Sequence, residues 1–99
     1  MENQQYDTER YQDLVTTFKA LANEDRLKMI DLLKDNKEMS AQEVERHFYL
    51  EQSTTSHHLN TLKRSKITKS RKQGRHIYYS IDTKNASKHL EYFLKEFLG

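Results

Sequence analysis

The chain has 99 residues, enough for one small domain, and a net charge of only +2. It contains no cysteine, which excludes disulfides, thiolate metal sites and cysteine nucleophiles, and it has no apolar run near the roughly 18 residues of a membrane span, so we expect a cytoplasmic protein without a membrane partner. Hydrophobic residues make up 34% of the chain and charged residues 32%, so a monomer has little apolar material for its core, and we expect part of it to be shared in a homodimer.

The first half of the chain is predicted to be helical, because it lacks both proline and glycine. Apolar residues in the segment 11–22 recur three and four positions apart, which is the stripe of an amphipathic helix. Asn23 is a favourable N-cap for a second helix, and the acidic residues Glu24 and Asp25 suit its first turn. This second helix should end in the polar stretch 35–37.

A third, short helix is predicted from Ser40 and Glu43, which have the spacing of a capping box, with Val44 and Phe48 on its buried side. After a short connection, Gln52–Arg64 is predicted to form a fourth helix with two unlike sides. Its thin apolar side consists of Thr55, Leu59 and Leu62. Its opposite side carries short polar or cationic groups: Ser53, Ser56, His57, Asn60 and Arg64.

The sequence pattern then changes from helical to alternating. Residues 67–72 and His76–Ile81 are two runs compatible with β-strands, and the connection between them contains Gly74, which can adopt the positive φ of a tight hairpin. A last helix follows, since apolar residues in the segment 86–98 again recur at helical spacing. The predicted order is α-α-α-α-β-β-α. The predicted fold is mainly α with a β-hairpin wing, a winged helix-turn-helix that spans residues 1–99 as a single domain.

Charge is unevenly distributed along the chain. Residues 1–51 have an excess of acid, whereas residues 52–81 carry seven Lys and Arg and no Asp or Glu. A basic stretch is often only a solvated surface. This one coincides with the predicted fourth helix and hairpin, which are the two elements that a winged helix places against DNA. We therefore predict double-stranded DNA as the partner.

The candidate DNA-binding residues lie on these two elements. The second helix of such a pair enters the major groove near its N-terminus, and the hairpin follows the flanking backbone or the minor groove. N-capping alone could account for Gln52 or Ser53, and a charged hairpin tip is often only soluble. The helix contributes Gln52, Ser53, Thr54, Ser56, His57, Asn60 and Arg64, and the hairpin contributes Lys72, Gln73 and Arg75.

Three stretches in this order resemble the ArsR family of bacterial repressors. They are the segment 18–27, Gln52-Ser-Thr-Thr-Ser-His-His-Leu59 and Gln73-Gly-Arg-His-Ile-Tyr-Tyr-Ser-Ile81, and the similarity extends over about residues 14–81. The resemblance implies a winged-helix homodimer that joins through its first and last helices and represses transcription from a two-fold symmetric operator. The apolar stripes of the first and last helices agree with such an interface.

No cofactor and no familiar metal effector are expected. The thiolate site of the ArsR family needs a Cys pair on the helix at 41–48, and its other common site needs paired histidines on the last helix; the sequence has neither. His57 and His58 are adjacent on a helix, so they point roughly 100° apart and cannot chelate one ion together; we expect His58 to pack or to lie near a phosphate. His47 and His89 are lone histidines, for which a solvated or core-edge position is favoured over an atypical metal site.

An enzyme is not expected, because the chain has no cysteine, no glycine-rich phosphate loop and no supported Ser/His/acid grouping. The alternative function is a winged-helix module for protein interaction, or an antirepressor that binds another regulator through its apolar end helices. The polar face of residues 52–60 discriminates between the two, because short polar side chains suit the reading of a DNA groove better than burial against a protein.

Overall fold

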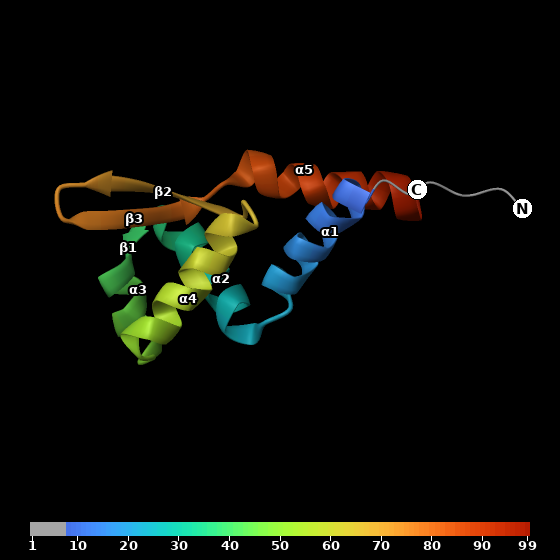
Figure 1. The fold of residues 1–99 in the computed structure, drawn as a ribbon. Helices are drawn as coiled ribbons and strands as arrows, with labels where there is room; N and C mark the ends of the chain where they lie inside the picture. The colour runs from blue at the N-terminus through green and yellow to red at the C-terminus, as the bar shows by residue number, and fades with distance from the viewer. Residues whose placement is uncertain (1–7) are drawn as a thin grey trace, which may run out of the picture.

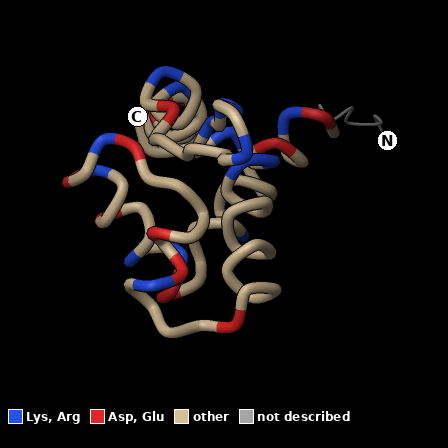
Figure 2. The backbone as a smooth tube through the Cα atoms, turned by 90° about the vertical axis from the view of Figure 1, so that its left-hand side faces the viewer, with Lys and Arg blue, Asp and Glu red and all other residues tan. Residues whose placement is uncertain are grey.

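The computed structural model describes residues 8–99, and the predicted winged helix-turn-helix is confirmed. The hairpin lies over α2, α3 and α4 at one end of the molecule, and α5 runs from it along α1 to the other end (Figure 1). Figure 2 views the backbone from the end that carries the hairpin. The elements are α1 (Thr8–Leu21), α2 (Glu24–Asn36), β1 (Met39–Ser40), α3 (Ala41–Phe48), α4 (Gln52–Arg64), β2 (Thr68–Gln73), β3 (His76–Ile81), α5 (Thr83–Phe93) and the π-helical turn η1 (Leu94–Leu98), which continues α5. None of the helices in this range is long and apolar enough to cross a membrane.

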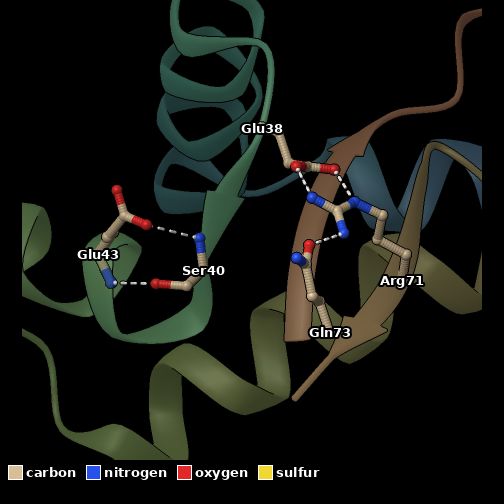
Figure 3. A network of polar contacts seen from close by, with 5 residues as sticks. All are labelled: Glu38, Ser40, Glu43, Arg71 and Gln73. Carbon is tan, nitrogen blue, oxygen red and sulfur yellow. Dashed lines mark hydrogen bonds and ion pairs between the residues drawn. The ribbon is translucent and has the colours of Figure 1, made fainter. Parts of the chain in front are cut away.

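The starts of α2 and α3 are set by the predicted caps. Oδ1 of Asn23 accepts the backbone N–H of Arg26 at 3.0 Å. Ser40 and Glu43 form a capping box, in which each side chain accepts the backbone N–H of the other residue at 3.2 Å (Figure 3). These hydrogen bonds satisfy donors that the first turn of a helix leaves open. Local sequence therefore fixes where both helices begin.

The core lies between α2, α3, α4 and the sheet. Thr55, which was predicted on the core side of α4, is 1% exposed. Val44 is fully buried as predicted, whereas Phe48 is only half-buried and packs at the edge of the core. Apolar packing of this kind holds α4 at one rotation about its own axis. The fully buried apolar side chains are Met29, Leu33, Val44, Leu59 and Leu62.

The sheet has a third strand that was not predicted. β1 consists of Met39 and Ser40, which pair with Tyr79 and Tyr78 of β3, so that the strand order is β1-β3-β2. Two residues are too few to produce an alternating pattern in the sequence. The pairing attaches the middle of β3 to the segment that leads into α3.

The hairpin has the tight turn that its glycine predicts. β2 and β3 pair in antiparallel register with Gln73 opposite His76, which leaves a two-residue turn. Gly74 in this turn has φ +63°, a left-handed conformation that residues with a Cβ rarely adopt. The first strand begins at Thr68, one residue later than predicted. The wing therefore ends in an exposed tip.

α1 and α5 pack against each other outside the core. The rings of Phe18 and Phe93 meet edge to face with 4.9 Å between their centroids, and those of Tyr11 and Phe97 with 6.4 Å. The molecule is elongated, with extents of 57 × 25 × 23 Å. Six large apolar side chains on α1, α5 and η1 stay 37–68% exposed: Val15, Phe18, Leu90, Leu94, Phe97 and Leu98.

The connection between α3 and α4 holds Tyr49 in a strained conformation. Its backbone is left-handed, with φ 52° and ψ 28°, at the C-terminal cap of α3. A residue with a Cβ pays about 1 kcal/mol to adopt this region, whereas glycine does not. The Tyr49 side chain is 95% exposed, so burial of the ring does not compensate.

Replacing Tyr49 by glycine should therefore stabilise the protein. We expect Tyr49→Gly to raise the free energy of unfolding by about 0.5–1 kcal/mol, measured by urea unfolding at a fixed protomer concentration. Arg46→Gly, at an exposed position inside α3, is the matched control and should lower it by about 1 kcal/mol. A destabilised Tyr49→Gly variant would contradict this account of the turn.

Candidate nucleic-acid interface

α4 presents the polar side that the sequence predicts. Its buried side consists of Thr55, His58, Leu59 and Leu62. Because residues three, four and seven apart share one face of a helix, the exposed side forms a continuous stripe. Thr54 is half-buried and lies at the border of this stripe. The exposed candidates are Gln52, Ser53, Ser56, His57, Asn60 and Arg64.

The first turn of α4 lacks a side-chain cap. The N-cap residue is Glu51, whose side chain makes no capping hydrogen bond. Gln52 and Ser53 occupy the first two helical positions, so neither has the capping role that was the alternative explanation for them. The backbone N–H groups of a first turn are open donors unless a side chain, water or ligand satisfies them.

The tip of the wing and the start of α4 border one shallow groove. Arg75 of the wing and Ser56 of α4 both line it, so the two predicted contact regions share a surface. Nδ1 of His76 donates to Oε1 of Gln42 at 3.3 Å, which links the wing to α3. The groove is lined by Ala41, Gln42, Glu45, Gln52, Thr55, Ser56, Arg75 and Ile77.

Glu45 brings an acidic side chain into this groove. It was missed because it lies on α3, outside the acid-free segment 52–81, and only the folding of α3 against α4 brings it there. The interface is therefore less uniformly basic than the linear sequence indicates.

The three wing candidates, Lys72, Gln73 and Arg75, are all exposed. The neighbouring Arg71 is engaged in contacts with the protein itself. Its Nε and Nη2 donate to the two carboxylate oxygens of Glu38 at 2.8 and 2.6 Å. Its guanidinium lies 4.9 Å from the ring centroid of Tyr78. Nη1 of Arg71 also donates to Oε1 of Gln73 (Figure 3). One cation of the basic segment is thus neutralised, and the carbonyl oxygen of Gln73 is used inside the wing.

The carboxyl group of Glu38 is ionised in its pair with Arg71 at neutral pH. The hydrogen bond from Arg71 holds the pKa of the Glu38 carboxyl below its ordinary value. A lowered pKa in the folded state adds stability above the ordinary pKa of glutamate, and this stability is lost only as the pH falls through the lowered value. The two residues are 33 positions apart, and no local pattern in the sequence pairs them.

The adjacent histidines of α4 face different environments. His57 is exposed on the polar stripe, whereas His58 is 7% exposed, which agrees with the packing role expected for it. His47 is exposed on α3, and half-buried His89 lines a groove between α1 and α5 with Glu9 and Asp13. Within residues 8–99, no three His, Cys, Asp or Glu side chains are grouped so that they could hold a metal ion.

Comparison with known proteins connects this geometry with a family. Residues 23–68 match the family described as bacterial regulatory protein, arsR family. The transcriptional repressor SdpR of Bacillus subtilis (strain 168) is 39% identical over 66 residues, which are 67% of this chain and 72% of that protein. The chain belongs to the ArsR family.

Other members extend the similarity. The arsenical resistance operon repressor of Staphylococcus aureus is 33% identical to this ArsR-family chain over 72 residues, 73% of this chain and 68% of that protein. The solution structure of a homodimeric winged helix-turn-helix DNA-binding domain from Mycobacterium bovis, a possible ArsR-family regulator, has a TM-score of 0.72 and 26% identity, and it covers 100% of this chain and 94% of that one. The ArsR-family chain is a DNA-binding transcriptional regulator.

Proposed function

We propose that this ArsR-family protein is a homodimeric repressor that binds a two-fold symmetric operator in double-stranded DNA. The observation that carries the proposal is the shared groove of α4 and the wing, where polar side chains of the helix stand opposite an exposed cation of the hairpin. The major groove admits a helix, and a hairpin beside it reaches the flanking backbone. Repression is inferred from the SdpR relative, which is a transcriptional repressor.

The proposal also covers the extent of the domain, its compartment and the absence of enzymatic activity. Residues 1–99 act as one DNA-binding domain in the cytoplasm, where bacterial DNA lies, and the protein is not an enzyme, in keeping with the regulators that it resembles. A protein-interaction module is disfavoured, because the exposed face of α4 carries short polar groups and no large apolar side chain.

Selection of bound duplexes from a random DNA pool tests the proposal directly. We expect the enriched sequences to align as a palindrome whose half-sites lie about one helical turn apart, near 34 Å, because a two-fold dimer presents two copies of α4 to successive major grooves. An equally tight association with all duplexes, without an enriched palindrome, would contradict a sequence-specific operator.

The two parts of the interface should differ in what they recognise. Ser56 and His57 present short donors on α4, so Ser56→Ala or His57→Ala should weaken operator binding more than binding to random DNA, by roughly 1–3 kcal/mol. Arg75→Ala should weaken both complexes similarly and lower the slope of log affinity against log salt by about one unit per subunit. Both are measured by fluorescence anisotropy over a salt series.

Lys95→Ala is the matched control, because η1 lies at the opposite end of the molecule from the wing (Figure 1), and it should leave both affinities unchanged. A changed sequence preference of Arg75→Ala with an unchanged salt slope would mean that the wing reads bases in the minor groove. That result would contradict the division between reading and anchoring.

The exposed apolar side chains of α1, α5 and η1 are proposed as the dimer interface. Phe97 is 41% exposed and stacks on Phe93 with 5.2 Å between ring centroids. Phe97→Glu places a hydrated charge in this apolar interface, which is costly to bury, so sedimentation should detect monomer or unfolded chain. Lys84→Glu, exposed on the same helix, is the control and should remain dimeric. An intact Phe97→Glu dimer would place the interface elsewhere.

No metal effector of the familiar kinds is proposed. The chain has no cysteine, and α3 and α5 carry one histidine each, His47 and His89. Zinc, nickel and arsenite should therefore change operator affinity by less than about tenfold, or about 1.4 kcal/mol of coupling. A larger, saturable loss of binding at stoichiometric metal would reveal a site, and His47→Ala and His89→Ala would be the variants that locate it.

A further inference from the structure

Arg26 connects α1 with α4 through a single guanidinium group. Its Nε donates to the backbone oxygen of Ala20 at 2.7 Å and its Nη2 to that of Lys19 at 3.0 Å. Both carbonyls belong to the last turn of α1, and that of Lys19 also accepts the backbone N–H of Ala22 at 3.3 Å. Nη1 of the same side chain lies 3.1 Å from Nδ1 of His58 on α4. Arg26 of α2 thus makes two hydrogen bonds to the end of α1 and one to the buried side of α4.

The chemistry of arginine determines the state of His58. A guanidinium has only donors and stays charged in proteins. Nδ1 of His58 must therefore accept, so the imidazole is neutral and carries its proton on Nε2. A protonated His58 would have N–H groups at both nitrogens and would turn one of them toward the Arg26 cation. The contact exists only in the neutral state.

The surroundings of His58 favour that state. Burial holds the pKa of the His58 imidazole below its ordinary value, and the cation of Arg26 and the neighbouring His57 act in the same direction. Asp25 on α2 opposes them. α1 contributes to this junction the two backbone carbonyls that accept hydrogen bonds from Arg26. At neutral pH His58 therefore remains an acceptor.

The position of this junction makes it relevant to DNA recognition. α1 carries part of the exposed apolar surface that is proposed as the dimer interface, and α4 carries the polar stripe. His58 directly follows His57, which lies on that stripe. A change in how α4 sits against α1 would therefore alter the relative placement of the two α4 helices in a dimer.

We propose that Arg26 is a positioning residue for operator binding: through neutral His58 it holds α4 at a fixed orientation to α1, and protonation of His58 releases the helix and weakens the complex. This inference rests on the proposed function as a dimeric DNA-binding repressor. The inference also requires that His58 of the free protein carries its proton on Nε2, and this can be tested without DNA.

The decisive variant is His58→Asn. Its Oδ1 can take the place of Nδ1 and accept from Arg26, but it does not titrate. At fixed ionic strength, operator affinity should be alike for the two proteins at pH 8, and as the pH falls to 5 the wild type should become weaker than His58→Asn by about tenfold, the effect of one hydrogen bond to a charged group.

Two further variants separate positioning from a general loss of structure. Arg26→Lys keeps the charge but cannot make three forked hydrogen bonds, so it should weaken operator binding at pH 8 by about tenfold while circular dichroism shows an unchanged fold. His47→Asn removes an exposed imidazole on α3 and should follow the wild-type pH profile.

Nitrogen NMR of the free protein supplies the test that needs no operator. The His58 signals at pH 8 should be those of a neutral imidazole protonated at Nε2, and they should change to those of an imidazolium as the pH is lowered. A proton on Nδ1, no protonation down to pH 5, or a constant affinity ratio while His58 takes up its proton would each overturn the inference. If no palindrome is selected from the DNA pool but the NMR result is as expected, the operator proposal fails and the tautomer assignment stands.

Discussion

The interface depends on the rotation of α4 about its own axis, which the core fixes. Thr55, Leu59 and Leu62 are at most 1% exposed and lock one side of the helix against α2, α3 and the sheet. Because residues three and four apart share a face, this packing alone turns Ser56 and His57 outward. A rotation by one residue, roughly 100°, would bury polar groups without partners and expose leucine. The apolar side chains behind the polar stripe thus turn it outward, whereas its placement relative to α1 depends on the contacts that join α4 to the rest of the protein.

The wing needs a different kind of support. A two-stranded hairpin is marginally stable alone, and here it is joined to the rest of the molecule by β1, by the pair of Glu38 and Arg71 and by the contact of His76 with Gln42. This support uses one cation of the basic segment. A count of charges along the sequence therefore overstates the cations that can reach a phosphate, because Arg71 is paired with Glu38. Arg71 therefore serves to position the wing and does not add to the charge available for DNA.

Features that depend on neighbours within about four residues could be predicted from the sequence. The cap at Asn23, the capping box at Ser40 and the two faces of α4 are of this kind, since helical periodicity and capping are local. The strand β1 could not be predicted, because its two residues form no pattern. The pair of Arg71 with Glu38 joins residues 33 positions apart, and that of Arg26 with His58 joins residues 32 apart. The sequence predicted which side chains face outward but not which ones hold the elements together.

The distribution of apolar residues connects assembly with recognition. Only 34% of the chain is hydrophobic, and yet six large apolar side chains on α1, α5 and η1 are left exposed in one protomer. A second copy that covers them would join the molecule at α1 and α5, away from the wing tip (Figure 1). The distance between the two polar stripes is then set by how each α4 is attached to its own α1. Hydrogen bonds to bases tolerate displacements of only a few tenths of an ångström. A rigid junction between the two helices is therefore as necessary for reading a symmetric operator as the side chains that touch it, and the three hydrogen bonds of Arg26 lie at that junction.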